Sequence, residues 1–273
     1  MGFKMTLVDT HIHVFKPGLK LAPVRRYVPE YRATIEDYQV PMDEAKISHA
    51  VLVQPSFLGT DNSYMCSVLK QHPKMLRGIA VINPTISEDE LDQLQSDGVV
   101  GIRLNLDGLP LPDFGQDNWP TLLRSLHKRA WQIEIHREAK DLPELISPLI
   151  DAGICVVVDH FGRPDDMLGA KDPGFQALLK FGSSRQVWFK LSGAYRNGSQ
   201  GRGFAGAAEQ STLLLEHIGA DRLVWGSDWP HTRHESYITI QKMLLCLDEW
   251  VLSEDIRARI LGANALKLFN FES

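Results

Sequence analysis

Short apolar runs rich in valine, isoleucine and leucine alternate with longer amphipathic stretches along the whole chain. Uninterrupted apolar runs of this kind are typical of strands that are buried on both faces of a parallel sheet. The pattern predicts eight strands: Leu7–Val14, His49–Gln54, Leu76–Ile82, Val99–Asn105, Gln132–His136, Cys155–His160, Val187–Leu191 and Leu223–Gly226.

The stretches between these runs carry apolar residues at helical spacing. They predict helices at Ser63–Gln71, Ser87–Ser96, Trp119–Arg129, Leu142–Ala152, Pro173–Phe181 and Ala205–Ile218. Segments 16–42 and 107–118 lack a regular pattern, and we expect them to be active-site loops. Segment 197–206 is rich in glycine and serine, and we expect it to be a surface loop, with a mobile lid over the site as the alternative.

Strands that alternate with helices along a chain form a parallel sheet, and eight of them close into a (β/α)8 barrel. We therefore predict an α/β fold, a TIM barrel that occupies residues 1–273 as a single domain. The competing fold is an open doubly wound sheet, which carries a glycine-rich phosphate loop after an early strand. This sequence has no such loop.

Composition narrows the class of protein. The chain is 44% hydrophobic with a net charge of -5 and no basic run, which argues against nucleic acid or an anionic membrane as partner. No apolar stretch is long enough to span a bilayer, and residues 1–5 carry no secretory hydrophobic region. The 3 cysteines lie far apart, so we expect neither a disulfide framework nor a thiolate metal site. We expect a cytoplasmic enzyme acting on a small molecule, and the sequence gives no signal for an oligomeric state.

The first predicted strand carries His11 and His13, two residues apart. Side chains alternate along a strand, so both imidazoles point toward the same spot. Two such imidazoles could bind a divalent metal or donate hydrogen bonds to a reacting carbonyl, and an ordinary half-buried pair is the alternative. In a closed barrel the carboxyl ends of all strands surround one site. The later predicted strands end near Arg103, His136, His160, Arg163, Arg196 and Asp228.

Four short segments carry a resemblance to a known family: Asp9–Phe15, Arg26–Pro29, Val158–Gly162 and Trp225–His231. Together they resemble the amidohydrolase superfamily, in the branch that contains 2-pyrone-4,6-dicarboxylate hydrolase and sugar lactonases. The resemblance runs over nearly the whole chain. It implies that His11, His13 and His160 polarise a lactone carbonyl, directly or through a metal, and that Tyr27 donates a hydrogen bond to substrate.

The resemblance also implies that Asp228 is the general base that takes a proton from the attacking water. A carboxylate suits this task near neutral pH when its surroundings raise its pKa. The alternative for Asp228 is a helix N-cap, because Trp229 and Pro230 follow it.

Arginines at the same strand ends indicate an anionic substrate, since a guanidinium forms paired planar contacts with carboxylates. Arg103, Arg163 and Arg196 are the candidates, and partners in structural ion pairs are the alternative. We group His136 with the substrate-binding residues, although metal-binding relatives use a histidine at that position.

Members of the superfamily with two metals bridge them with a lysine or glutamate at the end of the fourth strand. This chain has Arg103 and Asn105 there, so we do not expect a bridged pair of ions. We expect that no metal is required. The alternative is one divalent ion, such as zinc or manganese, held by His11, His13, His136 and Asp228.

These observations predict a hydrolase that opens a carboxylate-bearing lactone, such as 2-pyrone-4,6-dicarboxylate or a sugar-acid lactone. A metal-dependent decarboxylase of an aromatic acid on the same fold is an alternative. A non-catalytic anion-binding barrel is a third possibility, although simple binding has little use for a general base.

Overall fold

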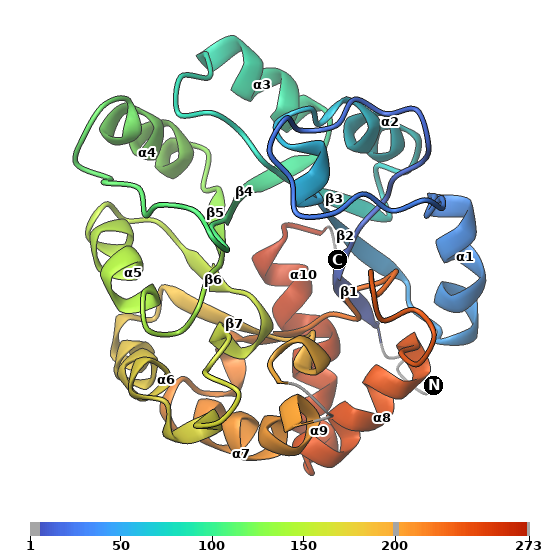
Figure 1. Ribbon diagram of the computed structural model, residues 1–273, viewed down its shortest axis with the longest axis vertical. Helices are drawn as coiled ribbons and strands as arrows, with labels where there is room; N and C mark the ends of the chain where they lie inside the picture. The colour runs from blue at the N-terminus through green and yellow to red at the C-terminus, as the bar shows by residue number, and fades with distance from the viewer. Residues whose placement is uncertain (1–5, 199–201, 272–273) are drawn as a thin grey trace.

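Eight parallel strands follow one another around the molecule in the order in which they occur along the chain (Figure 1). The computed structural model describes residues 6–198 and 202–271. The strands are β1 (Val8–Ile12), β2 (His49–Val53), β3 (Leu76–Ala80), β4 (Val99–Asn105), β5 (Gln132–His136), β6 (Val156–Val158), β7 (Val187–Leu191) and β8 (Leu223–Trp225). This arrangement confirms the predicted (β/α)8 barrel.

The first strand and the segment that follows the last one meet along a seam that brings the barrel nearly to closure. Ile12 and Trp229 form a parallel bridge there. The backbone N–H of His13 donates to the carbonyl of Trp229 at 2.8 Å, and the N–H of Asp228 donates to the carbonyl of His11 at 2.9 Å. The seam therefore brings the histidines of the first strand beside the aspartate that follows the last one.

An outer ring of helices covers the strands, and the last helix lies across one end of the barrel, as Figure 1 shows. The helices are α1 (Ile35–Glu44), α2 (Ser63–Gln71), α3 (Glu88–Ser96), α4 (Trp119–Lys128), α5 (Leu142–Asp151), α6 (Pro173–Leu178), α7 (Arg202–His217), α8 (Ile240–Trp250), α9 (Glu254–Ala258) and α10 (Asn264–Leu268). Helices α2 to α5 match the predicted ranges to within one residue at each end.

The prediction that segment 16–42 is a loop throughout was wrong in its second half, where α1 begins at Ile35. Thr34 caps this helix: its hydroxyl accepts the N–H of Asp37, and the Asp37 carboxylate accepts the N–H of Thr34. Such a reciprocal cap satisfies two backbone donors that the first turn leaves unpaired. Ile35 and Tyr38 lie on its buried face. The stabilisation from the cap and from this buried face exceeds the cost of the proline at position 41.

Two further parts of the chain differ from the sequence-based expectation. Helix α7 begins at Arg202, so the second half of segment 197–206 is helical, and residues 199–201 lie outside the described residues. Helices α8, α9 and α10 were not predicted. In α8 the buried Ile240, Met243 and Leu247 recur at helical spacing, so the signal was present in the sequence.

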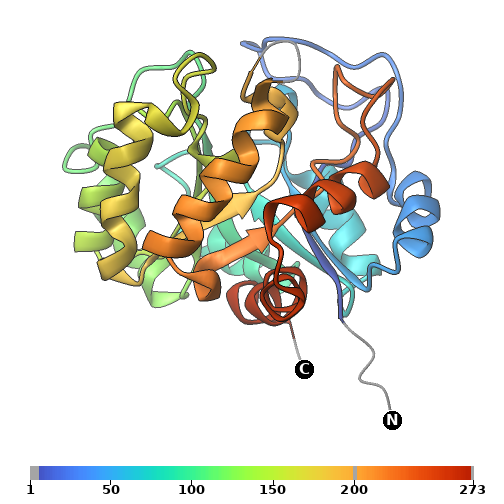
Figure 2. The same ribbon diagram turned by 90° about the horizontal axis from the view of Figure 1, so that it is seen from below.

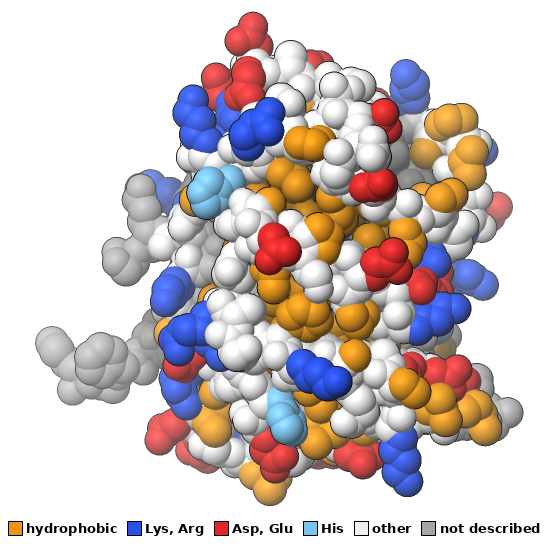
Figure 3. All heavy atoms as spheres, turned by 90° about the vertical axis from the view of Figure 1, so that its left-hand side faces the viewer, with side chains coloured by type: hydrophobic (Ala, Val, Ile, Leu, Met, Phe, Trp, Pro, Cys, Tyr) orange, Lys and Arg blue, Asp and Glu red, His pale blue; other side chains and the backbone are white. Residues whose placement is uncertain are grey.

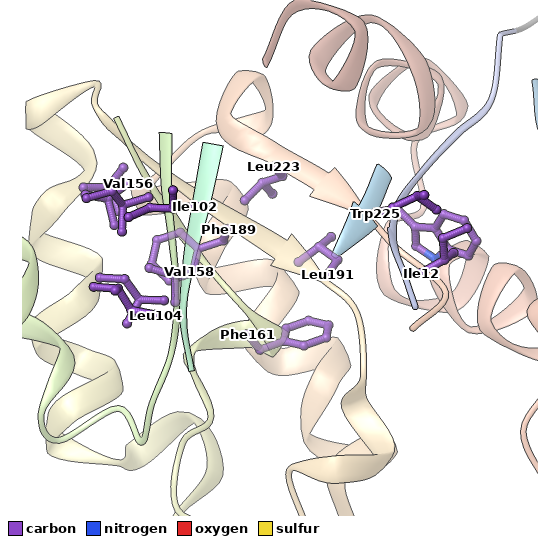
Figure 4. Packing of buried hydrophobic residues seen from close by; sticks show 14 of the residues in the cluster. Ile12, Ile102, Leu104, Val156, Val158, Phe161, Phe189, Leu191, Leu223 and Trp225 are labelled. Atoms are coloured by element: carbon purple, nitrogen blue, oxygen red, sulfur yellow. The ribbon is translucent and has the colours of Figure 1, made fainter. Parts of the chain in front are cut away.

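The main hydrophobic core lies between the strands and the helices. Figure 4 shows side chains of β4, β6, β7 and β8 that belong to it, with Ile12 and Trp225 side by side at the seam. Successive strand residues point to opposite sides, so every second residue joins this layer and the others point into the barrel.

A second cluster fills the lower half of the barrel. The inward-facing Val51, Val157 and Val224 pack against Leu268 and Phe269 at the end of α10. Figure 2 shows the last helix across the end of the barrel opposite the carboxyl ends of the strands. Because this end is plugged by apolar side chains, a site inside the barrel is open only at the carboxyl ends of the strands.

The outer surface carries charges of both signs. On the face covered by α4, α5 and α6, hydrophobic side chains show between lysines, arginines and acidic residues (Figure 3). Among the described residues, none of the helices combines the length and the apolar character that crossing a bilayer would take.

Candidate active site

A cavity of about 370 Å³ lies at the carboxyl ends of the strands. Its volume suits a small ring rather than a polymer. It is lined by His13, Arg26, Tyr27, Pro55, Ser56, Arg103, Asn105, Asp107, His136, His160, Arg163, Tyr195, Arg196, Gly198, Asp228, Arg233 and His234.

The cavity brings together eight of the nine residues that the sequence proposed for the site: His13, Tyr27, Arg103, His136, His160, Arg163, Arg196 and Asp228. The ninth, His11, is fully buried directly behind them, with its Nε2 3.9 Å from Oδ1 of Asp228. The geometric expectation that imidazoles of the first strand lie beside the acid at position 228 therefore holds.

The two oxygens of Asp228 have different surroundings. Oδ2 accepts hydrogen bonds from the Tyr195 hydroxyl at 2.6 Å and from Nε of Arg196. Oδ1 faces Nε2 of His13 at 3.5 Å and Nε2 of His11 at 3.9 Å. One oxygen is thus held by fixed donors, and the other is directed toward the histidines.

The pKa of Asp228 moves in the direction opposite to our expectation. Burial raises the pKa, but the positive charge of Arg196 lowers it by more, to well below its usual range. The carboxylate is therefore ionised throughout the neutral range. In this state it can accept a proton, but it is a weaker base than an ordinary buried carboxylate.

His13 has a defined tautomer. Its Nδ1 lies 2.7 Å from the carbonyl oxygen of Val53. A carbonyl only accepts, so Nδ1 carries the proton. In the neutral ring Nε2 then presents a lone pair toward Oδ1 of Asp228, and two acceptors face each other across 3.5 Å. Such a gap suits a bridging proton, a water molecule or a cation.

His160 lies at the start of a short 3₁₀ turn (His160–Gly162) that follows β6. Its Nδ1 is 2.8 Å from the Ser192 hydroxyl. Gly193 packs against the same ring, and a Cβ on Gly193 would lie 2.6 Å from Nδ1 of His160. Burial lowers the pKa of His160 to about 4, and it lowers those of His11 and His136 well below their usual range. These three imidazoles are therefore neutral.

Four charged side chains form a buried layer at the floor of the cavity, which we call the charged layer: Arg103, Glu134, Asp159 and Lys190. Nε of Arg103 donates to Oδ2 of Asp159 at 2.9 Å. Nζ of Lys190 donates to Oε2 of Glu134 at 2.6 Å and lies 3.4 Å from Oδ1 of Asp159. The basic side chains of Arg103 and Lys190 thus face the carboxyl groups of Asp159 and Glu134 in this layer.

Sequence reasoning assigned no role to Glu134, Asp159 and Lys190. The sequence signal that could have pointed to them is a charged residue inside an apolar run, as where Glu134 stands between Ile133 and Ile135. A charged side chain in a run that is otherwise buried on both faces must find a partner inside the barrel.

Two further arginines of the cavity, Arg26 and Arg163, meet Asp107, which was not predicted either. Arg26 pairs with Asp107, and Nη1 of Arg163 lies 3.2 Å from its Oδ1. Asn105 accepts from Nη2 of Arg26 at 3.3 Å and lies 3.2 Å from Nδ1 of His136. Asp107 and Asn105 therefore hold one wall of the cavity in place. Tyr195 and Arg233 are further lining residues that the sequence pattern did not single out.

Three buried donor atoms fit a single metal ion. Nitrogen atoms of His11 and His13 and a carboxylate oxygen of Asp228 all lie within 4.8 Å of one another. In the described residues a second group of this kind comprises His11, Asp159 and His160, but the charged layer already engages Asp159. His136 belongs to neither group, so the donors brought together are three of the four that the sequence proposed.

Asp9 joins the two segments that carry these donors. Its Oδ1 accepts the N–H of Ser227 at 2.8 Å and that of His11 at 3.2 Å, and its Oδ2 accepts the Tyr38 hydroxyl at 3.0 Å. The carboxylate thereby fixes β1, α1 and the segment after β8 relative to one another.

Comparison with known proteins gives a consistent result. The model of the Amidohydrolase family matches residues 8–271. A 2-pyrone-4,6-dicarboxylate hydrolase of Comamonas testosteroni is 30% identical, covering 96% of this chain and 89% of its own. A 4-sulfomuconolactone hydrolase of Hydrogenophaga intermedia is 28% identical, covering 96% of this chain and 88% of its own.

Solved structures agree. A probable 2-pyrone-4,6-dicarboxylic acid hydrolase of Acinetobacter baumannii, with citric acid bound, superposes with a TM-score of 0.93 at 39% identity, covering 98% of this chain and 100% of its own. A more distant barrel of Burkholderia multivorans holds zinc; it has a TM-score of 0.82 at 15% identity and covers 98% of this chain and 100% of its own. That likeness shows the fold alone.

Proposed function

The chain belongs to the amidohydrolase family, and on this premise we propose that it hydrolyses a lactone that carries one or more carboxylates. Curated relatives that cover nearly all of the chain are enzymes that act on lactones. The observation that carries the proposal is the position of Asp228, whose Oδ1 faces two buried imidazoles at the edge of a cavity lined by arginines.

The cavity suits an anion. Among the described residues, five arginines line it, against the carboxylates of Asp107 and Asp228. Guanidinium groups bind carboxylates in pairs of parallel hydrogen bonds, so they orient a planar ring as well as attract it. The Acinetobacter relative was solved with a tricarboxylic acid bound. We assign Arg103, Arg163, Arg196, Tyr27 and His136 to binding the carboxylates and ring of the substrate.

We propose that water attacks the ring carbonyl carbon while Asp228 takes its proton through Oδ1. The lone pair on Nε2 of His13 would help to orient this water, because it faces the same oxygen. The bond between the carbonyl carbon and the ring oxygen then breaks. The ring oxygen takes the proton that Asp228 removed from the water, which restores the carboxylate of Asp228, and the product is an open-chain acid with one additional carboxylate.

The low pKa of Asp228 is compatible with this scheme if the binding of substrate raises that pKa. Arg196 lies in the wall of the cavity and pairs with Asp228. A substrate carboxylate would compete for this guanidinium and weaken its hold on Asp228. The pKa of Asp228 would then rise, so the base would become stronger when a substrate is present.

The developing charge on the carbonyl oxygen requires hydrogen-bond donors in a site without bulk water. We assign His11 and His160 to this role, because both are buried and neutral. If a divalent ion such as zinc or manganese is bound, His11, His13 and Asp228 would hold it, and it would supply Lewis-acid polarisation of the carbonyl.

A panel of lactones tests the proposal. We expect ring opening of 2-pyrone-4,6-dicarboxylate, sulfomuconolactone or an aldonolactone acid, and none of a neutral lactone of the same ring size. Asp228→Asn should lower kcat by roughly 10²- to 10⁴-fold, because the amide cannot take the proton. Circular dichroism should show that the variant keeps the native fold.

Assays with and without chelator show whether a metal contributes. Near-normal turnover by a folded Asp228→Asn variant would remove the general base from the scheme. Release of carbon dioxide from an aromatic acid, with no lactone opened, would replace the hydrolase by a decarboxylase. Tight anion binding without any turnover would indicate a binding protein.

A further inference from the structure

Lys190 is completely buried inside the barrel, and the proposed reaction gives it no part. It stands near the end of β7, above Phe269 of the apolar plug, with its Nζ 5.9 Å from the ring centre. A buried ammonium is costly unless it is paired, and replacing a buried ion pair by apolar residues is often neutral for stability. The position of Lys190 therefore calls for an explanation beyond stability.

The three donors of the Lys190 ammonium have three neighbours. Nζ lies 2.6 Å from Oε2 of Glu134, 3.4 Å from Oδ1 of Asp159 and 3.1 Å from Nδ1 of His11. An ammonium donates and cannot accept, so Nδ1 of His11 must accept in this contact. A neutral imidazole that accepts at Nδ1 carries its proton at Nε2.

The other ring nitrogen of His11 is left without a partner. Among the described residues, Nε2 has no hydrogen-bond partner although it is buried. Its nearest charged neighbour is Oδ1 of Asp228 at 3.9 Å, beyond hydrogen-bonding distance. A buried donor of this kind is satisfied when a substrate oxygen enters.

We propose that Lys190 is a positioning residue that holds His11 as the Nε2–H tautomer, so that His11 offers a hydrogen-bond donor to the substrate carbonyl oxygen. Glu134 of β5, two strands away, fixes the ammonium at 2.6 Å. The alternative partner for Nδ1 is Oδ1 of Asp159 at 3.5 Å. That contact would place the proton on Nδ1 and leave a lone pair on Nε2, the form that a metal ligand requires. The kinetic part of this inference rests on the proposed lactone hydrolysis.

The test begins with the tautomer, which needs no substrate. Histidine labelled with ¹⁵N, in protein as purified and with its metal content measured, shows which ring nitrogen carries a proton. Loss of signals in His11→Gln identifies the His11 resonances. We expect the proton on Nε2. A proton on Nδ1, with or without a bound metal, overturns the proposal.

The second step removes the donor to Nδ1. Lys190→Met alone leaves Glu134 as an unpaired buried carboxylate, so the test variant is Lys190→Met combined with Glu134→Gln, which removes one charge of each sign. We expect the His11 proton to shift toward Nδ1 and kcat to fall roughly 10- to 100-fold with little change in KM, as for residues that orient a catalytic group. Lys70→Met, which removes a lysine paired with Asp97 outside the cavity, is the matched control and should leave both measurements unchanged.

Three results decide against the proposal: a folded double variant whose His11 tautomer is unchanged, one whose kcat is unchanged after the tautomer has moved, and one whose loss appears in KM alone. If the double variant does not fold, the tautomer of the wild-type protein still decides. If the wild-type protein opens no lactone, the proposed function fails, whereas the tautomer measurement keeps its meaning.

Discussion

Gly193 has no side chain, and this decides where the His160 ring can lie. Its φ is +56°, in the left-handed region that favours glycine, and a Cβ there would meet Nδ1 of His160 at 2.6 Å. His160 cannot move away freely, because it also contacts Ser192. A residue that touches no substrate thus sets the position of one that we assign to the oxyanion.

Gly193→Ala should therefore reduce activity by more than backbone strain alone explains. The matched control is Gly169→Ala, whose φ is +53° and whose Cβ would have nothing within 4 Å. Each variant loses roughly 1 kcal/mol from the left-handed conformation, and only Gly193→Ala displaces the imidazole. Urea unfolding and kcat/KM of both variants separate the two effects. Equal activity in the two variants would contradict the argument.

At the scale of the elements, helix α1 connects a terminal cap to the site. Thr34 and Asp37 form its reciprocal cap, and Tyr38 in its second turn donates to Asp9, which holds the N–H groups of Ser227 and His11. An ordered first turn of α1 therefore helps to hold the seam between β1 and the segment after β8 in place.

Thr34→Ala removes the cap and should lower the free energy of unfolding by about 1 kcal/mol. Thr34→Ser keeps the hydroxyl and should restore most of this loss. Urea titrations followed by circular dichroism measure both, and the dependence on urea concentration should keep its slope because the same surface is exposed on unfolding. A serine variant as unstable as the alanine variant would show that the methyl group of Thr34, not the cap, matters.

The elements also show what the sequence could predict. Strands such as β4 and β7 were predicted with correct ends. A short apolar run flanked by polar residues is typical of a strand buried on both faces, so the ends of the run mark the ends of the strand. The residues at the strand ends were placed in one site for a similar reason, since a closed barrel brings all its carboxyl ends together.

Other features depend on contacts that no local pattern contains. The charged layer requires Glu134 of β5 and Lys190 of β7 to point into the barrel at one height, and this depends on the register between strands. Asp107 and Tyr195 come from segments after strands, and only the folded chain shows that they meet Arg163 and Asp228. For these residues the sequence gives the type of side chain but not its partner.

At the scale of the whole molecule, buried histidines tie stability to pH. Burial lowers the pKa of His231 to about 4 from the ordinary 6.5, and in the described residues its Nε2 has no hydrogen-bond partner. The folded state holds this ring neutral, whereas the unfolded chain protonates it below pH 6.5. Between pH 6.5 and 4 the unfolded state thus binds more protons, so the free energy of unfolding falls as the pH falls.

His231→Gln tests this linkage without changing the net charge of the folded protein near neutrality. The glutamine side chain takes up no proton on unfolding. Between pH 7 and pH 4.5 the free energy of unfolding of the variant should therefore fall by about 2 kcal/mol less than that of the wild-type protein. Urea titrations at a series of pH values measure the difference. Buried carboxyl groups such as Asp9, whose pKa burial raises to about 6, contribute equally to both proteins and cancel in the comparison. Parallel pH profiles for the two proteins would mean that His231 is protonated in the folded state as readily as in the unfolded chain, and that its burial carries no cost in acid.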